Sequence, residues 1–359
     1  MSLELKNVTK VVGVETHIYQ TTIKFKPSGF NVLLGATNAG KSTLIKLLAG
    51  FEKPTSGQVI FDGNDVTGIN PQKRNISLVH QFFINYPHMT VYDNIASPLR
   101  VARIAQSEIH KRVHETAELL QLEKFLERRP PELSGGQQQR TALARAIVKQ
   151  SKVILLDEPL ANLDYKLREE LREQLPNILE QRGTVVIYAT TEPTEALLLG
   201  GSTALLHEGR VVQFGPTSKI YHAPNNLIAS RVFSDPPINF ALVSKCGDYI
   251  QLDDLVWPIT GSLNSLKDDR YIVAIRPHHI TPNRMAEFCV SLKGKVQITE
   301  LSGSESIAHF TLGDRSWVSQ APGIHQYSVG EEYEFFFDPE QCFYFHESGS
   351  HVIEEVADG

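Results

Sequence analysis

Cysteine is scarce in this chain: only Cys246, Cys289 and Cys342 occur among 359 residues. An odd number of widely spaced cysteines fits neither a disulfide framework nor a metal-ligand pattern, so we expect a reducing compartment. Long hydrophobic runs are missing too, since residues 153–156 form a typical run and about 20 apolar residues are needed to cross a bilayer. The first residues lack the basic and apolar segments of a secretory signal. These absences predict a soluble chain that reaches a membrane only through a partner.

An excess of positive charge is also absent. With 35 Lys and Arg against 41 Asp and Glu, the net charge is −6, which excludes a general attraction to nucleic acid or to an anionic bilayer. The balance of 41% hydrophobic and 21% charged residues is ordinary for a globular protein and excludes disorder and collagen-like structure. A length of 359 residues favours two domains, because a typical domain has roughly 100–200 residues.

The first two-thirds of the chain alternates short apolar runs with amphipathic helical patterns, which is typical of an α/β domain. The alternation of strand and helix patterns ends at Ser234-Asp235-Pro236-Pro237, where two prolines cannot continue a helix. We therefore expect one domain at 1–235 and a second at 236–359. In the first domain we expect strands at 30–34, 59–61, 76–81, 153–156 and 184–189, and helices at 41–49, 107–120 and 136–148.

The second domain has short alternating segments that Gly, Pro and Asp separate, a pattern that predicts a small β-barrel or sandwich. The sequence therefore predicts an α/β domain followed by an all-β domain. The expected strands of the second domain are 271–275, 295–299, 306–311, 316–318 and 332–337.

A phosphate-loop pattern lies between the expected strand at 30–34 and the expected helix at 41–49. It reads Gly35-Ala36-Thr37-Asn38-Ala39-Gly40-Lys41-Ser42 and is followed by Thr43. Glycines let backbone N–H groups turn toward a polyphosphate, and the helix N-terminus adds partial positive charge. Lys41 supplies a cation for the outer phosphates, and Ser42 supplies a hydroxyl for Mg²⁺. The alternative is a chance glycine turn, which rarely follows a strand.

A second apolar run, residues 153–156, leads directly into Asp157 and Glu158. Ligands of open α/β sheets bind at the C-terminal ends of the strands, so both carboxylates are expected at that edge. Asp157 would hold the metal, directly or through water, and Glu158 would polarise a water against the γ-phosphate as general base. Solvated surface charge is the alternative for Asp-Glu alone. Together with the phosphate loop, the pair predicts an NTPase.

A glycine-containing motif precedes Asp157 and opens an expected helix with Ser134 as its N-cap. It reads Leu133-Ser134-Gly135-Gly136-Gln137-Gln138-Gln139-Arg140, and in this order of motifs it resembles the signature of ABC transporter ATP-binding subunits. Its physical logic is a second anion site, because N–H groups at a helix N-terminus can receive a γ-phosphate. In that family residues 134–137 close on ATP bound to the opposite subunit. A glycine-rich linker is the alternative.

Three further segments extend the resemblance. Gln81 matches the family's glutamine that touches Mg²⁺ and the attacking water, although a glutamine at a strand end is usually only a surface residue. The following stretch, with Tyr86-Pro87-His88-Met89-Thr90-Val91, resembles the contact surface for transmembrane subunits, and an internally packed loop is the alternative. Leu160-Ala161-Asn162-Leu163-Asp164 matches the loop that crosses between paired ATP sites, which places Asp164 at a nucleotide site.

Two positions depart from the family pattern. The family carries a histidine that contacts the γ-phosphate after the strand expected at 184–189, and Thr191 stands there in this sequence. A threonine hydroxyl forms hydrogen bonds but neither carries charge nor shuttles a proton as imidazole does. The aromatic residue that usually stacks on adenine is also absent. Its place falls on Val12, with His17 and Tyr19 as candidate substitutes.

Only the histidine and the adenine-stacking aromatic residue of the family pattern are missing, whereas Lys41, Gln81, Glu158 and the signature are intact. The ATP site of this chain is therefore impaired, but its signature can still complete the site of a partner. The resemblance therefore implies an ATPase that pairs with a second ATPase subunit in a heterodimer. The partner would supply the histidine at its own site, and residues 134–137 here would complete that more competent site. The site built on Lys41 would bind ATP and hydrolyse it slowly. In the alternative, Thr191 with Glu158 suffices and both sites work.

The C-terminal part resembles the oligobinding (OB-fold-like) β-barrel appended to sugar-importer ATPases, for which the family implies regulation or dimer contact. The resemblance rests on Ile275-Arg276-Pro277-His278-His279-Ile280, on Gly303-Ser304-Glu305 and on the strand expected at 332–337. Nucleic-acid binding is the rival for a small barrel, but the acidic stretch Glu331-Glu332-Tyr333-Glu334 and the lack of a basic stripe argue against it. On a strand, the adjacent His278 and His279 would point to opposite faces and make poor joint metal ligands.

The resemblance covers nearly the whole chain and is to ATP-binding subunits of carbohydrate and polyol importers, of the maltose and glycerol-phosphate type. Gln81-Phe82-Phe83-Ile84-Asn85-Tyr86-Pro87 and Ala189-Thr190-Thr191-Glu192-Pro193 look like the glycerol-import subgroup, which uses two different ATPase subunits. The solute implied is glycerol, another polyol or a sugar.

This resemblance implies ATP and Mg²⁺ as cofactors and a peripheral place on the cytoplasmic side of the inner membrane. It also implies permease subunits contacted through the residues after Gln81, an indirectly coupled substrate-binding protein, and no nucleic acid. One rival is a predominantly regulatory, nucleotide-sensing subunit with slow hydrolysis. Another is a non-transport ABC ATPase that acts on nucleic acid or ribosomes.

Overall fold

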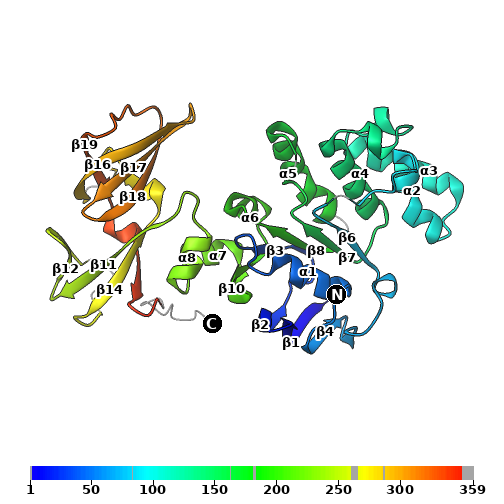
Figure 1. The fold of residues 1–359 in the computed structure, drawn as a ribbon, viewed down its shortest axis with the longest axis horizontal. Coiled ribbons are helices and arrows are strands. Elements are labelled where there is room, and N and C mark those ends of the chain that lie inside the picture. Colours follow the sequence, from blue (N-terminus) through cyan, green and yellow to red (C-terminus); the bar gives the residue numbers. More distant parts are fainter. Residues whose placement is uncertain are drawn as a thin grey trace. The chain divides into compact units, whose positions relative to one another are not determined.

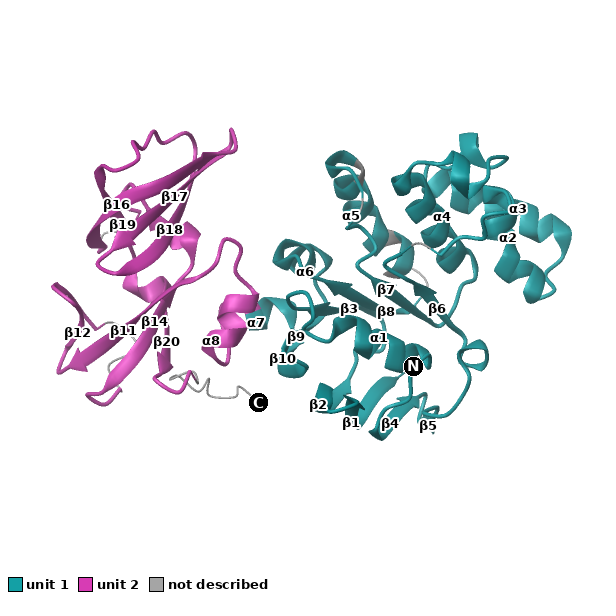
Figure 2. Ribbon diagram, in the orientation of Figure 1, with its two compact units in different colours: residues 1–220 teal, residues 221–359 magenta. Residues whose placement is uncertain are grey.

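The computed structural model describes residues 2–82, 84–161, 163–180, 183–259, 266–285 and 288–349, which form two compact units (Figure 2). Unit 1 comprises residues 1–220 and unit 2 comprises residues 221–359. The division falls inside helix α7 (Thr217–His222), ahead of the sequence-based boundary at 235/236, so helix α8 (Leu227–Val232) is part of unit 2. No helix within these ranges combines the length and the apolar character needed to cross a membrane.

Unit 1 contains two sheets (Figure 1). Its strands are β1 (Leu3–Val12), β2 (Glu15–Lys24), β3 (Gly29–Leu34), β4 (Ser56–Phe61), β5 (Asn64–Asp65), β6 (Ile76–Val79), β7 (Val153–Asp157), β8 (Val185–Thr190), β9 (Ser202–His207) and β10 (Arg210–Pro216). The central sheet has the order β10-β9-β3-β8-β7-β6, parallel except for β10, and the other sheet is antiparallel with the order β2-β1-β4-β5. Every residue of β7 and β8 is buried, as expected for central strands of a parallel sheet.

In the described part of unit 1, the α-helices ahead of α7 are α1 (Lys41–Ala49), α2 (Val91–Val101), α3 (Gln106–Leu119), α4 (Gly135–Val148), α5 (Tyr165–Glu180) and α6 (Pro193–Leu199). Helix α1 packs between the two sheets, because its Leu44 and Leu48 share one core with Leu5 of β1 and Leu155 of β7. Helices α5 and α6 contact β3, and α2, α3 and α4 contact one another. The packing of α1 holds its N-terminus at the end of strand β3.

After helix α8, unit 2 is an all-β domain with two five-stranded sheets that share a core. Its strands are β11 (Asn239–Cys246), β12 (Tyr249–Leu252), β13 (Leu255–Pro258), β14 (Arg270–Ile275), β15 (Ile280–Thr281), β16 (Val290–Leu301), β17 (Glu305–Leu312), β18 (Arg315–Pro322), β19 (Glu332–Phe337) and β20 (Phe343–His346). The sheet orders are β13-β12-β11-β14-β20 and β15-β19-β16-β17-β18. The core contains Trp257, Trp317, Phe310 and Phe335. This confirms the predicted all-β, OB-like domain.

Buried Arg276 ties the start of unit 2 to its sheets. Its guanidinium donates to the carbonyl oxygens of Phe233, at 2.9 Å, and of Tyr221, at 2.6 Å. It also lies 3.7 Å from the centroid of the Tyr221 ring, a cation–π contact. Desolvation lowers the pKa of Arg276.

Some of the helices and strands predicted from the sequence have the observed bounds, and others differ from the structure. The helix at 41–49 and the strand at 332–337 have the predicted bounds, but the strand expected at 76–81 ends at Val79, so Gln81 lies in the turn after it. The prediction that His278 and His279 point to opposite faces of a strand is wrong. They belong to a 3-10 turn that opens with Pro277, and their ring centroids are 4.3 Å apart.

Candidate functional site

The phosphate loop connects strand β3 to helix α1, as predicted. Gly40 precedes the helix with φ +104°, a conformation that L side chains rarely adopt. A Cβ on Gly35 would lie 2.4 Å from the carbonyl oxygen of Leu206, so the loop has no room for a side chain there. The first N–H groups of α1 have no partner within the helix. Free N–H groups of this kind can bind an anion together with those of the loop.

Lys41 is the first residue of α1, and it is only 4% exposed. Its Nζ donates to the carbonyl oxygens of Gly35, at 2.8 Å, and of Ala36, at 3.0 Å. The same Nζ lies 3.4 Å from Oε1 of Glu158. Burial lowers the pKa of Lys41, and the Glu158 carboxylate opposes that shift. The ammonium is therefore held at the loop by carbonyl groups that a phosphate could replace.

Asp157 ends strand β7 and is almost fully buried. Its Oδ1 accepts a hydrogen bond of 3.0 Å from Oγ of Ser42. Desolvation raises the pKa of Asp157, and the bond from Ser42 opposes that shift.

These oxygen donors fit Mg²⁺. Within the described ranges, no three His, Cys, Asp or Glu side chains cluster as a metal site. Mg²⁺ is usually bound by one or two carboxylates together with substrate phosphates. The hydroxyl of Ser42 and the carboxylate of Asp157 are oxygen donors of this kind, already in contact with each other.

Glu158 follows β7 in the left-handed region, with φ +48°. Its N–H donates to the carbonyl oxygen of Ala189 in β8 at 3.0 Å. Its Oε2 accepts a hydrogen bond of 3.1 Å from Nε2 of Gln81. The carboxylate therefore lies between the amide of Gln81 and the ammonium of Lys41, and the structure brings these three predicted site residues together.

The predicted signature begins helix α4. Ser134 is the N-cap, and its Oγ accepts from the N–H of Gln137 while Gln137 Oε1 accepts from the N–H of Ser134. A Cβ on Gly136 would lie 3.3 Å from Cδ2 of Leu163, so the signature packs beside the loop that follows Glu158. Among the residues described, no hydrogen bond joins 134–137 to the phosphate loop 35–43.

The two departures from the family pattern lie on the surface. Thr191 is exposed directly after β8, and the next residue, Glu192, donates its N–H to Oγ1 of Thr190 at 3.0 Å. Val12 is 48% exposed at the end of β1. Its two candidate substitutes both contact charged side chains. The guanidinium of Arg210 lies 3.6 Å from the ring centroid of Tyr19, and Nε2 of His17 lies 3.7 Å from a carboxylate oxygen of Glu15.

The segment after Gln81 is fixed to two helices. The backbone of Tyr86 exchanges two hydrogen bonds, of 2.9 and 3.1 Å, with the side-chain amide of buried Asn94 in α2. Arg145 of α4 donates to the carbonyl oxygen of Ile84 at 2.8 Å, and its guanidinium lies 4.7 Å from the Tyr86 ring centroid. Phe82 is 76% exposed, whereas Phe83 lies outside the described residues.

A groove of about 560 Å³ adjoins this segment. Its lining comes from α1 and the turn after it, from the end of β6, and from α4. The lining residues are Lys46, Phe51, Glu52, Leu78, Val79, His80, Ile84, Ala142 and Arg145.

Sequence analysis missed a set of charged residues behind Thr191. Arg168 and Arg172 of α5 form ion pairs of 3.0 Å with Glu192, and Arg172 also lies 3.3 Å from Glu195. The sequence did contain a signal for these ion pairs. It has two arginines one turn apart on a helical pattern and two glutamates three residues apart after a strand.

Two family models match the chain. One is described as ABC transporter and covers residues 19–161, which include the phosphate loop, the signature and Asp157-Glu158. The other is described as a TOBE domain and covers residues 273–345 in unit 2.

Similar proteins extend the match over nearly the whole chain. The putative uncharacterized ABC transporter ATP-binding protein YcjV of Escherichia coli (strain K12) is 34% identical over 96% of this chain and 97% of its own. The trehalose/maltose import ATP-binding protein MalK of Thermococcus litoralis is 35% identical over 98% of this chain and 99% of its own. The maltose/maltodextrin import ATP-binding protein MalK of Vibrio vulnificus is 33% identical over 97% of this chain and 96% of its own.

Solved structures agree with the fold of the first domain. The dimeric ATP-binding cassette MJ0796 in a post-hydrolysis state, bound to ADP and Pi, matches with a TM-score of 0.55 and 31% identity. The match covers 60% of this chain and 98% of that one. A second dimeric structure of MJ0796 gives a TM-score of 0.56. The predicted phosphate-loop α/β fold is thereby confirmed.

Proposed function

The chain belongs to the ABC transporter family of ATP-binding subunits, and from this premise we propose that its ATP hydrolysis drives import of a small carbohydrate or polyol. The observation that carries the proposal is the meeting of Lys41, Gln81 and Glu158 at one edge of the central sheet. It supplies a cation for phosphate and a carboxylate for water at a single place, which is what ATP hydrolysis requires.

The phosphates of ATP bind to the loop of residues 35–43. Backbone N–H groups of the loop and of the first turn of α1 donate to phosphate oxygens. Lys41 exchanges the carbonyl groups of Gly35 and Ala36 for the outer phosphates, which gives its buried ammonium an anionic partner.

Ser42, Asp157 and Gln81 would hold Mg²⁺ beside those phosphates. When bound, the ion supplies positive charge that neutralises phosphate oxygens during phosphoryl transfer. It also gives the buried Asp157 carboxylate a counter-charge, which this side chain needs because desolvation disfavours its ionised form.

Glu158 acts as general base on the attacking water. A water oxygen forms a bond to the γ-phosphorus, its proton passes to the Glu158 carboxylate, and the bond to the oxygen between the β- and γ-phosphorus breaks. ADP and inorganic phosphate leave. Gln81 orients the base through its bond to Oε2. The Thr191 hydroxyl donates to the γ-phosphate at the position where the family pattern described above has a histidine.

A second ATPase cassette completes each site. Residues 134–137 present the first N–H groups of α4 to the γ-phosphate of ATP on a paired subunit, and Asp164 contributes from the neighbouring loop. The exposed position of Ser134 and Gly135 supports this role, as does the dimeric assembly of MJ0796.

The pair is a heterodimer in this proposal. Thr191 cannot supply the charge of an imidazole, so the site of Lys41 hydrolyses ATP slowly, and a second ATPase subunit with histidine at this position provides the faster site. The same observation favours a second candidate function, a nucleotide-sensing subunit whose own hydrolysis is minor and whose C-terminal domain is regulatory.

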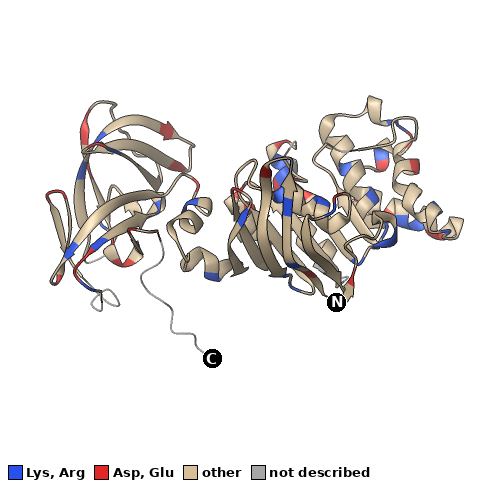
Figure 3. Ribbon diagram, turned by 60° about the horizontal axis from the view of Figure 1, so that its bottom comes forward, with Lys and Arg blue, Asp and Glu red and all other residues tan. Residues whose placement is uncertain are grey.

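Permease subunits dock on the groove next to the segment after Gln81. Exposed Phe51, Phe82 and Ile84 offer apolar surface to an inserted helix, and Arg145 links the groove to helix α4, which starts at the signature. This contact places the chain peripherally on the cytoplasmic side of the inner membrane, with a substrate-binding protein coupled only indirectly. Acidic and basic residues are interspersed over both units (Figure 3), which does not favour nucleic acid as the partner.

Glycerol, another polyol or a sugar is the proposed solute. The stretches around Gln81 and Thr191, which look like the glycerol-import subgroup, support glycerol. The MalK relatives, which are named for maltose and trehalose import, support a sugar. The solute does not touch this subunit, so the test is uptake of labelled glycerol and maltose by cells with and without the gene.

The enzymatic proposal is tested by Glu158→Gln in the assembled transporter, compared with the corresponding change in the partner ATPase. We expect the partner's change to remove most of the ATPase rate and Glu158→Gln to remove a minor part. Equal losses would exclude the asymmetry but keep the ATPase function. Absence of ATPase activity in the wild-type assembly, with ATP still bound, would instead favour the nucleotide-sensing role.

A further inference from the structure

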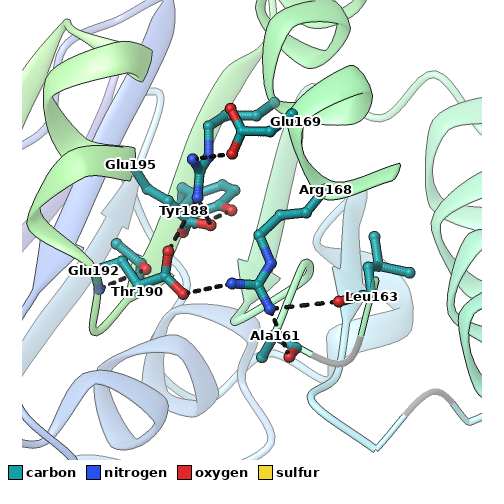
Figure 4. Close-up of polar contacts among 9 residues, drawn as sticks. Ala161, Leu163, Arg168, Glu169, Tyr188, Thr190, Glu192 and Glu195 are labelled. Carbon is teal, nitrogen blue, oxygen red and sulfur yellow. Dashed lines mark hydrogen bonds and ion pairs between the residues drawn. The ribbon is translucent and has the colours of Figure 1, made fainter. Parts of the chain in front are cut away.

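Arg168 of helix α5 joins two loops that flank the proposed general base (Figure 4). Its Nη1 donates to Oε1 of Glu192 at 3.0 Å, beyond the end of strand β8. Its Nη2 donates to the carbonyl oxygens of Ala161, at 3.2 Å, and of Leu163, at 3.4 Å, in the loop that follows β7. One planar guanidinium therefore bridges both loops at once.

The Glu192 end of this bridge is anchored in the protein interior. The N–H of Glu192 is bound to Thr190 Oγ1, and its other carboxylate oxygen accepts from Arg172 at 3.0 Å. Arg172 in turn lies 3.3 Å from buried Glu195, whose second oxygen accepts from the hydroxyl of Tyr188. Figure 4 shows the side chains of Tyr188, Glu192 and Glu195 within this network. The anchor is a connected network, so Arg168 is held from that side.

The other end of the bridge leads directly to Glu158. The N–H of Ala161 donates to the Glu158 carbonyl oxygen at 3.4 Å, and the N–H of Glu158 donates to Ala189 in β8. Glu158 itself has φ +48°, a backbone conformation that side-chain-bearing residues adopt at a cost and keep only when their surroundings hold it. The contacts of Arg168 to Ala161 and Leu163 are among those that fix this turn.

We infer that Arg168, anchored by Glu192, is a positioning residue that holds the Glu158 turn in place for hydrolysis without taking part in ATP binding. This inference rests on the proposed ATPase function. None of the bonds of Arg168 described above involves the phosphate loop, so nucleotide affinity should not depend on it. A small displacement of Glu158 would, in contrast, slow proton transfer from water.

A purely structural role is the competing explanation, and the exposure of the pair argues against it. The side chains of Arg168 and Glu192 are 24% and 39% exposed. Ion pairs this accessible to water contribute little to stability because water and salt screen them. Loss of Arg168 should therefore change catalysis more than folding.

The test uses an assembly whose second ATPase subunit carries the change that corresponds to Glu158→Gln, so that the remaining turnover comes from this chain. Arg168→Gln should lower kcat about 10-fold or more, with KM and the Kd for a fluorescent ATP analogue changed less than about 2-fold. Arg168→Lys keeps the ion pair but cannot reach both loops, so its kcat should be intermediate. Arg112→Gln is the matched control, because Arg112 forms an ion pair of similar exposure with Glu108 on α3.

Two further measurements keep the inference falsifiable. Hydrogen exchange in the segment after Glu158 should accelerate in Arg168→Gln and not in Arg112→Gln. Glu192→Gln should lower kcat as well, and adding it to Arg168→Gln should cause little further loss, since both act through one link. Unchanged kcat in Arg168→Gln, or equal changes in kcat and Kd, overturns the inference. An inactive, fully wild-type assembly overturns the proposed ATPase function itself.

Discussion

Nε2 of Gln81 lies 3.1 Å from Oε2 of Glu158, so a side chain two residues beyond the end of strand β6 holds the carboxylate that follows strand β7. A neutral amide donor fixes the orientation of a carboxylate without adding charge beside it. Because Gln81 also begins the segment bound to α2 and α4, we expect movement of that segment to change the support of the proposed base. This relationship links the proposed permease contact to hydrolysis through a single hydrogen bond.

Replacement of Gln81 by glutamate should therefore impair hydrolysis beyond the loss of one donor. A second carboxylate beside Glu158 disfavours two negative charges, so one carboxyl group stays protonated to higher pH. We expect kcat to fall about 10²-fold and the acidic limb of the pH–rate profile to move to higher pH. Gln58→Glu is the control, because Gln58 forms a similar bond of 2.7 Å to Asp65 away from the site. A profile that keeps its shape would argue that Glu158 is not the base.

Asp157→Asn should stabilise the nucleotide-free protein while it abolishes Mg²⁺-dependent hydrolysis. Desolvation raises the pKa of Asp157 above its unfolded value, so its ionised form opposes folding, and stability from this group is lost as pH rises through the folded pKa. Asparagine keeps the hydrogen bond from Ser42 without the buried charge. Thermal unfolding at pH 7 without nucleotide should show a Tm higher by about 2 °C or more. The difference from wild type should shrink as pH falls, and a lower Tm for the variant contradicts this account.

The sequence was most informative where one residue type is physically required. Gly35 has no space for a Cβ, and Gly40 has a positive φ. The strand before Asp157 is apolar because it is buried on both faces. These constraints made the phosphate loop, helix α1 and the carboxylates predictable. The contacts of Arg168 were not, because they depend on how α5 lies against the turns after β7 and β8. The 3-10 turn at His278 was missed although Pro277 at its first position, which favours the start of a helical turn, was a signal for it.

Gly294→Ala should destabilise unit 2, since a Cβ there would lie 2.1 Å from the Phe310 ring. Phe310 stacks on Phe335, with ring centroids 4.3 Å apart, so the ring cannot move without disturbing the core. Overpacking of this kind costs about 1–3 kcal/mol in the free energy of unfolding. Chemical denaturation of the full chain measures it. Gly68→Ala, where a Cβ would meet open space, is the control, and equal effects of the two variants would exclude the steric explanation.

Arg276→Met should also weaken unit 2. The change leaves the carbonyl oxygens of Phe233 and Tyr221 without the donor that binds them and removes the cation–π contact to Tyr221. Loss of partners for buried carbonyl groups costs about 1–3 kcal/mol each, so we expect the unfolding transition of this unit to shift to lower denaturant. Arg270→Met is the control, because Arg270 is 57% exposed and pairs with Glu347 at the surface. A stability equal to that of the control would show that Arg276 is not a structural anchor.

Thr191→His should accelerate hydrolysis at this chain's own site. The threonine follows β8 and is exposed, so an imidazole fits there without repacking the core. A protonated imidazole would donate to the γ-phosphate where negative charge develops, and one such donor contributes about 10²-fold or more in other enzymes. In the assembly with an inactivated partner site, we expect kcat to rise at least about 10-fold with little change in KM. Thr194→His, at an exposed position in the first turn of α6, is the control. If Thr191→His leaves kcat unchanged, Thr191 with Glu158 suffices, and the proposed asymmetry between the two ATP sites loses its physical basis.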